Sequence, residues 1–185
     1  MTATTTGKPI RSFTGVHGVY SNFSACSAPV FLEDDDPVVG YRNTEYAYQA
    51  AKGLDEFYRE HVRTRPSSGS AKAAGGPGKV VLRPGWDLGV KDHVMLSLLR
   101  QKFHPAKPEG QALRLTGERH LEEGNRHGDR YWGTVGGEGK NMLGLLLMQV
   151  RGEHFPDDCP AMHVLDYESD WHALGEHLVA LEASR

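Results

Sequence analysis

The sequence contains little cysteine and no long apolar run. Only Cys26 and Cys159 occur among 185 residues, so no disulfide framework is expected and a reducing, cytoplasmic location is predicted. No stretch approaches the roughly 20 apolar residues that span a bilayer. The segment from Met1 to Lys8 also lacks the apolar core of a secretory signal. We therefore expect no membrane partner.

An excess of basic residues is also missing, as are the common metal and phosphate motifs. The chain has 21 Lys and Arg against 24 Asp and Glu, which argues against a nucleic-acid coat but leaves room for a local phosphate pocket. No two histidines are spaced i, i+4, so a zinc site is not expected. The run 75–79 (GGPGK) fails as a phosphate loop because Ala73 stands where glycine is required. Neither a metal nor an organic cofactor is predicted.

The residues that are present suit one globular domain. A chain of 185 residues matches the usual size of a single domain, and 38% of its residues are apolar. We expect a flexible arm at 1–12, one functional domain at 13–153 and a C-terminal extension at 154–185. An amphipathic helix of that extension, capped by Ser169, is expected to pack on the domain.

Hydrophobic periodicity predicts a mainly α fold with a few short β-strands, with α+β as the alternative. Long helices are expected at 43–65, 86–103 and 141–151, and shorter ones at 70–74 and 109–115. The helix at 141–151 is apolar on nearly every side, which is typical of a central buried helix. Short strands are expected around 16–31 and at 38–41, and the acidic run 33–36 is expected to be a solvated loop.

The predicted helix that begins at Asn43 or Thr44 carries a polar stripe. Glu45, Gln49 and Lys52 are spaced i, i+4, i+7 and therefore share one face, with the first and last about 10 Å apart along the axis. Spacing alone favours an ordinary solvated face. The alternative is a carboxylate and an amine that line one wall of a cleft, with the helix dipole favouring the ionised form of Glu45.

A second polar cluster lies in the loop-like region 121–137. It combines carboxylates, Glu123 and Asp129 among them, with the aromatic Trp132. Carboxylates can stabilise an oxocarbenium ion or position water, and an exposed indole offers a stacking face for a base. The alternative for Trp132 is a core anchor. Glycines 136, 137 and 139 precede the apolar helix, where backbone N–H groups could hold an anion; the alternative is a flexible turn.

These pieces belong to motifs that follow one another from about Gly15 to Arg151. The motifs are 18–24 (GVYSNFS), 43–52 (NTEYAYQAAK), 70–75 (SAKAAG), Trp86-Asp87 through Met95 to Lys102-Phe103, Thr116-Gly117, 121–123 (LEE), Asp129, Trp132-Gly133, and 139–144 (GKNMLG) through Leu147-Met148 to Arg151. The series resembles the NADAR family, also called the YbiA-like family. That family has a T-x-E-H-x-x-Q-x-x-K helix, an S-x-x-A-K-x-x-G segment and a W-D…M…K-F helix.

The sequence departs from the family pattern in three places. Tyr46 stands where the family usually has His. The block at 70–75 lacks the usual Pro and following Arg, and the tail after His154 has no counterpart. The first two departures concern details of substrate contact.

The resemblance implies a mostly helical fold and N-glycosidase activity, without a cofactor. Two substrate classes are implied: phosphoribosylamino-pyrimidine intermediates of riboflavin synthesis, and ADP-ribose attached to guanine, including guanine in nucleic acid. In both, ribose C1 is bonded to an exocyclic amine and the 5 position carries phosphate. The alternative is a non-catalytic module that binds ADP-ribose or another nucleotide and tolerates the loss of Glu45.

With this resemblance, Glu45 is interpreted as the acid/base or electrostatic carboxylate near the ribose. Lys52 either holds an anion or forms a Schiff base, and Asp129 or Glu123 positions water or binds ribose hydroxyls. Trp132 stacks on the base, Asn22 bonds to ribose or base, and Lys72 contacts phosphate. The catalytic candidates are thus Glu45, Lys52 and Asp129. The candidates for substrate binding are Asn22, Phe23, Gln49, Lys72, Glu123, Trp132, Gly133 and Asn141.

Overall fold

The chain is mainly helical, as the sequence predicts, in a computed structural model that describes residues 7–165, 175–177, 179–180 and 183–184. It divides into two compact units. Unit 1 comprises Met1–Ser24 and Phe103–Asp166, and unit 2 comprises Ala25–Lys102 and Tyr167–Arg185.

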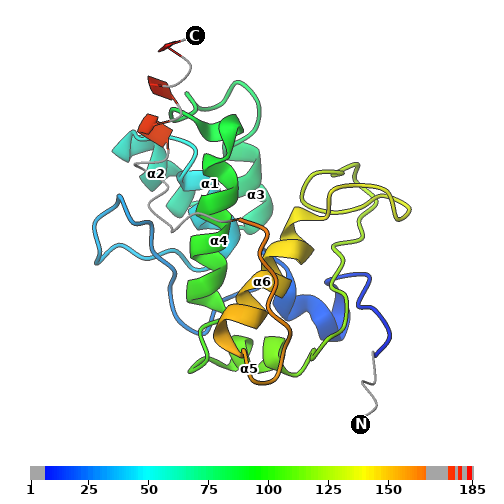
Figure 1. Cartoon of the computed structure of the whole chain (residues 1–185). Coiled ribbons are helices and arrows are strands. Elements are labelled where there is room, and N and C mark those ends of the chain that lie inside the picture. Colours follow the sequence, from blue (N-terminus) through cyan, green and yellow to red (C-terminus); the bar gives the residue numbers. More distant parts are fainter. Residues whose placement is uncertain (1–6, 166–174, 178, 181–182, 185) are drawn as a thin grey trace. The chain divides into compact units, whose positions relative to one another are not determined.

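Unit 2 is built around one buried helix. Its elements are α1 (Thr44–Ala50), α2 (Glu56–Arg63), α3 (Ser68–Ala74), the 3-10 helix η2 (Trp86–Leu88) and α4 (Val90–Lys102). Helix α1 contacts α2, α3 and α4, and Figure 1 shows these helices side by side. Residues 92–99 of α4 are all buried, so this helix forms the centre of the unit and α1 lies against it.

Side-chain caps start the three short helices of unit 2. The carbonyl oxygen of the Asn43 side chain accepts the N–H of Tyr46 at 3.1 Å, which confirms Asn43 as the cap of α1. Asp55 caps α2 in the same manner, and Ser67 and Ser70 form a capping box at α3. The amide nitrogen of Asn43 also donates to the Ser68 hydroxyl at 2.9 Å, so one side chain ties the start of α1 to the start of α3.

Two helices that the periodicity predicts as continuous are interrupted. The helix expected at 43–65 ends at Ala50 and restarts at Glu56, because Asp55 is extended and caps a new helix. The helical phase changes at this break, and the apolar side chains of Leu54 and Phe57 are exposed. The helix expected at 86–103 is divided at Gly89, whose φ of 126° no α-helix accommodates.

The acidic run 33–36 is not the solvated loop that its composition predicts. One carboxylate oxygen of Asp34 accepts bonds from Arg59 at 2.7 Å and from Arg83 at 2.9 Å, and both arginines are buried. Asp35 pairs with Arg63 at 3.2 Å. The acidic residues therefore fasten this segment to α2 and to the segment before η2, because buried guanidinium groups need anionic partners.

Unit 1 contains the 3-10 helix η1 (Gly15–Tyr20), α5 (Pro108–Arg114) and α6 (Met142–His154), and α5 contacts both others. The prediction of strands around 16–31 is largely wrong, since η1 occupies 15–20. This 3-10 helix buries Tyr20, whose hydroxyl donates to the carbonyl of Ala112 at 2.9 Å. The described residues contain isolated β-bridges in place of longer strands. Helix α6 is buried along most of its length, as its apolar sequence predicts.

The C-terminal helix predicted after Ser169 falls mostly outside the described residues. The predicted domain limits at 12/13 and 153/154 stay a prediction. Among the described residues, no helix is both long enough and apolar enough to cross a membrane.

Candidate functional site

The polar stripe of α1 is buried, not solvated. Glu45 is 5% exposed and Gln49 is 3% exposed, although both are polar. The amide nitrogen of Gln49 donates to a carboxylate oxygen of Glu45 at 2.8 Å. The amide oxygen of Gln49 has no hydrogen-bond partner among the described residues. Burying polar groups costs free energy, so this pair is a strong candidate for a functional site.

Gly75, the residue that follows α3, lies against two side chains of the stripe, Gln49 and Lys52. The Lys52 ammonium donates to the Gly75 carbonyl at 2.6 Å. A Cβ placed on Gly75 would lie 2.0 Å from the amide oxygen of Gln49, so only glycine leaves room for that side chain. Tyr58 closes the arrangement, with its hydroxyl donating to the Gln49 main-chain carbonyl at 2.8 Å. Helices α1, α2 and α3 thus fix the stripe together.

The surroundings of Lys52 shift its charge state. Burial lowers its pKa below the ordinary value for lysine; the Glu45 carboxylate opposes this effect, and Lys72 adds to it. Asp87 and Lys91 also act on this amine, the first raising and the second lowering its pKa. A lysine with a lowered pKa has a larger neutral fraction, which nucleophilic amine chemistry requires.

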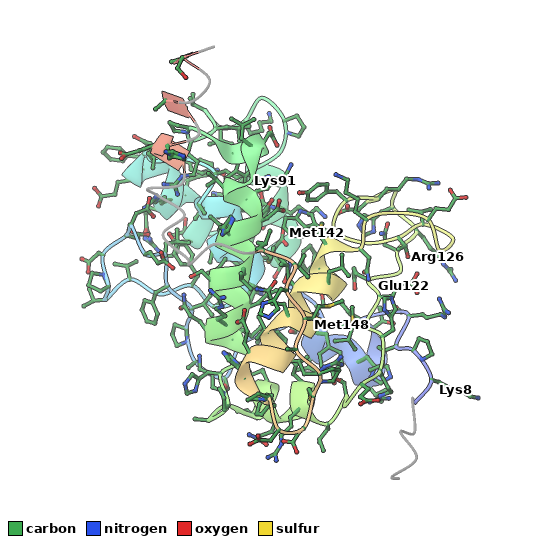
Figure 2. All side chains as sticks on the ribbon, viewed as in Figure 1. Lys8, Lys91, Glu122, Arg126, Met142 and Met148 are labelled. Carbon is green, nitrogen blue, oxygen red and sulfur yellow. The ribbon has the colours of Figure 1, made fainter. Side chains whose placement is uncertain are left out.

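Asp87 and Lys91 are residues that the sequence reasoning missed as site candidates. Lys91 lies in the first turn of α4, as Figure 2 shows, and its ammonium donates to the Asp87 carboxylate at 3.0 Å. The i, i+4 spacing of this acid and base could have indicated the pair, but many exposed pairs on helix surfaces share the same spacing. Lys72, which the sequence analysis did predict, is exposed on the last turn of α3.

Aromatic rings cover the same part of unit 2. The Lys52 ammonium lies 5.7 Å from the centre of the Tyr48 ring, and the rings of Tyr48 and Trp86 are 5.2 Å apart. Both aromatic residues are buried. Their low-polarity surroundings explain why Lys52 is desolvated although its amine is bonded to a carbonyl.

In unit 1, the loop 121–141 uses its polar side chains differently. One carboxylate oxygen of Asp129 accepts the N–H of Tyr131 at 3.0 Å and the N–H of Trp132 at 2.9 Å. Asn125 receives the N–H of Asp129 and donates to the carbonyls of Asp129 and Thr134. Asp129 therefore shapes the turn that presents Trp132, and the partly exposed indole contacts the Tyr131 ring edge-on at 5.3 Å.

The remaining loop candidates meet at the start of α6. Asn141, with a φ of 53°, accepts the N–H of Glu123 at 2.9 Å and donates to the carbonyl of Leu121 at 2.8 Å. A Cβ on Gly133 would lie 2.1 Å from the Glu123 carbonyl, so this position requires glycine.

The first N–H groups of α6 itself are not available to an anion. The N–H groups of Met142 and Leu143, at the start of α6, already donate to the carbonyls of Tyr131 and Trp132. These bonds use the groups that an anion would need. Figure 2 shows Met142 at this end of the helix.

Asn22 and Phe23 follow η1 in unit 1. Asn22 is buried and Phe23 is 44% exposed. The structure thus groups Glu45, Gln49, Lys52 and Lys72 in unit 2, and Glu123, Asp129, Trp132, Gly133 and Asn141 on one loop of unit 1. Among the described residues, no three His, Cys, Asp or Glu side chains gather as metal ligands would.

The geometry defines a mainly helical protein with a buried carboxylate–amide pair on one short helix and a desolvated lysine just after that helix. Residues 12–153 match the NADAR domain, so the chain belongs to the NADAR family. It is 37% identical to N-glycosidase YbiA of Escherichia coli (strain K12) over 136 residues, which cover 73% of this chain and 80% of that protein.

Two further comparisons agree with this family. A riboflavin biosynthesis protein of Vibrio vulnificus (strain YJ016) is 32% identical over 138 residues, covering 74% of this chain and 35% of that protein. The NMR structure of the E. coli protein YbiA matches with a TM-score of 0.66 at 34% identity, covering 84% of this chain and 89% of that chain.

Proposed function

We propose that the protein is an N-glycosidase that hydrolyses the bond between ribose C1 and an exocyclic amine of a heterocycle, in a substrate with phosphate at the ribose 5 position. The relatives named N-glycosidase support the reaction, and the relative named for riboflavin biosynthesis supports a phosphoribosylamino-pyrimidine substrate. ADP-ribosylated guanine is the second substrate class. The observation that carries the proposal is the buried Glu45, held by Gln49 next to a desolvated lysine.

The reaction consumes one water molecule and needs no other reactant. The C1–N bond breaks, its electron pair stays on the amine nitrogen, and that nitrogen takes up a proton. Water adds to C1 and gives up a proton, which leaves ribose phosphate and a free heterocyclic amine. Glu45 is proposed to exchange these protons or to stabilise the positive charge that develops at C1.

Lys52 is proposed to act in one of two ways. As an ammonium it holds an anionic group of the substrate. As a neutral amine it attacks C1 and displaces the protonated heterocyclic amine; the sugar ring then opens to a Schiff base, which water hydrolyses. Borohydride reduces a Schiff base to a stable amine. A mass increase on Lys52 after borohydride treatment during turnover supports the second role, and unmodified Lys52 in active enzyme supports the first.

The other candidates keep proposed roles in substrate binding. Trp132 is proposed to stack on the base. Asp129 is proposed to set the orientation of Trp132, because one of its carboxylate oxygens accepts two backbone N–H groups of this turn. The second carboxylate oxygen of Asp129 is proposed to contact a ribose hydroxyl or water. Gln49 is proposed to orient Glu45, and Lys72 to contact phosphate. Direct or indirect substrate contact is proposed for Asn22, Phe23, Glu123, Gly133 and Asn141.

The direct test is the Glu45→Gln variant, assayed for release of free amine from a phosphoribosylamino-pyrimidine and from ADP-ribosylated guanosine. General acid–base catalysis contributes about 10²–10⁴-fold, so we expect a loss of at least that order on the true substrate. The matched control is Glu56→Gln, which changes an exposed glutamate in the first turn of α2. Wild-type turnover by Glu45→Gln contradicts the proposal. Binding of ADP-ribose without any product identifies a non-catalytic module.

A further inference from the structure

Unit 2 carries an apolar groove that lies outside the α1 stripe. The groove has a volume of about 580 Å³. One wall runs from the end of α1 into the first turn of α2, and the other is the segment 79–84. We call this hollow the α2 groove. Its lining consists of Gly53, Leu54, Asp55, Tyr58, Lys79, Val80, Val81, Leu82, Arg83 and Pro84.

Large apolar side chains at the α2 groove face solvent. Val81 is 90% exposed, Leu54 is 51% exposed and Leu82 is 44% exposed. Phe57, in the first turn of α2, is 86% exposed and adjoins the groove, because its chain neighbour Tyr58 is part of the lining. Soluble chains keep contiguous exposed apolar patches small, and larger ones mark surfaces that another molecule covers. This surface is therefore a candidate protein interface.

Two opposite charges flank this surface. Glu56 precedes Phe57 in α2, and Lys79 lies on the facing wall of the groove; both residues are exposed. Neither side chain forms an ion pair within the described part of the chain, whereas Glu60 of the same helix pairs with Arg63. The surface thus offers one carboxylate beside the protruding ring and one ammonium beside the hollow, which a partner with the reverse arrangement would complement.

A second copy of the chain has that arrangement. In a two-fold dimer the same surface lies on both sides of the interface, so each residue of one copy meets the same partner residue twice. Phe57 of each copy can then enter the α2 groove of the other, because ring and groove adjoin and the axis can pass between them. The same rotation brings Glu56 of each copy toward Lys79 of the other copy. The surface is therefore complementary to itself in both shape and charge.

We propose that Phe57 and the α2 groove form the interface of a two-fold dimer of this chain. The proposal is independent of the glycosidase function, because Glu45, Gln49 and Lys52 do not line the groove and association needs no substrate.

Sedimentation equilibrium of the full chain tests the proposal directly. We expect the average mass to rise from that of one chain toward twice that value between roughly 1 and 100 µM, the weak end of the affinities of specific interfaces. Phe57→Ser removes the ring from both contacts and should weaken association by roughly 100-fold or more. Leu115→Ser is the matched control, since Leu115 is 82% exposed but belongs to unit 1. It should associate as the wild type does.

Charge reversal distinguishes a second copy from any other occupant of the groove. Glu56→Lys and Lys79→Glu each place like charges opposite one another at both contacts, so each variant alone should associate roughly tenfold more weakly at low salt. An equimolar mixture of the two variants restores opposite charges at both contacts and should associate as the wild type does. Lys8→Glu, at an exposed lysine of unit 1, is the control for the change in net charge.

Three results would each overturn the proposal. The first is a wild-type chain that keeps the mass of one copy at every concentration. The second is a dimer that Phe57→Ser leaves as strong as the wild type, because its interface then lies elsewhere. The third is a mixture of Glu56→Lys and Lys79→Glu that associates no better than either variant alone, which would assign the groove to another protein or to the chain's own C-terminal segment. Where Phe57→Ser fails to fold by circular dichroism, the charge variants decide.

Discussion

Helix α1 and the loop 121–141 both carry predicted site residues, but they use their polar groups in opposite ways. On α1, Glu45 and Gln49 are buried and bind one another through side-chain atoms. In the loop, the side chains of Asp129 and Asn141 bind main-chain groups. The helix holds reactive groups that its own backbone does not need, whereas the loop needs its polar groups to keep its shape.

This difference separates activity from stability. A change on α1 disturbs a carboxylate and an amide that bind one another through side-chain atoms, so it should appear first as a lower rate. A change in the loop leaves buried N–H and C=O groups without partners, which costs about 1–3 kcal/mol each. It should therefore appear first as a lower free energy of unfolding.

Among changes outside Glu45 itself, Gly75→Ala should give the largest effect on the rate. The new methyl group would overlap the Gln49 amide oxygen, which lies 2.0 Å from the ideal Cβ position, and would push the side chain that holds Glu45. A displacement of about 1 Å at a catalytic group can cost about 10²-fold. We expect kcat for amine release to fall by about that factor, with little change in KM. Steady-state kinetics on the substrate that the wild-type protein cleaves measure both constants.

Gly69→Ala is the matched control for this experiment. Gly69 lies in the same helix, and its nearest neighbour is the Ser67 hydroxyl at 3.9 Å, so a methyl group fits there. The φ of Gly75 is −92°, which alanine also adopts, so backbone strain does not explain a loss at that position. Equal kcat values for the two variants would show that Gln49 does not position Glu45.

The sequence predicts the helices well where apolar spacing is regular and fails where one residue interrupts it. The buried α6 follows directly from its run of leucines. The break after Ala50 depends on Asp55, which caps the start of a new helix. Aspartate can also occur inside a helix, so the residue type alone does not reveal the break. The break at Gly89 depends on a backbone angle that spacing does not reveal.

The candidate site was likewise predictable from the sequence only in part. The i, i+4, i+7 spacing places Glu45, Gln49 and Lys52 on one face, but their burial depends on Gly75, a residue that comes from α3. Contacts between helices far apart in sequence are not encoded in local spacing. The family resemblance identifies the loop residues, but the backbone bonds of Asp129 and Asn141 become visible only in three dimensions.

Asn141 should give the next largest effect, on stability. Asn141→Gly keeps the left-handed φ of 53° without strain and leaves two backbone groups without their partner, so we expect a loss of about 2–6 kcal/mol in the free energy of unfolding. Asn141→Ala should lose about 1 kcal/mol more, because alanine disfavours this φ. Urea unfolding measures both values. A glycine variant as stable as the wild type would show that the loop does not depend on these bonds.

The smallest effect concerns the charge of Lys52. Because burial lowers the pKa of Lys52 in the folded state, this group binds more protons in the unfolded chain than in the folded chain between that lowered pKa and the ordinary lysine value of 10.5. The free energy of unfolding contributed by this group therefore rises as pH increases through that window.

Lys52→Met removes the titration, so the stability difference between wild type and variant should shift in favour of the wild type from pH 7 to pH 10. Urea unfolding of both proteins at the two pH values measures this shift, and Lys79→Met gives a control at an exposed lysine. A difference that stays constant would mean that Lys52 is fully protonated in the folded protein throughout this range. It would then favour the anion-holding role over the Schiff base, and α1 would resemble the loop in using its polar groups for structure and binding.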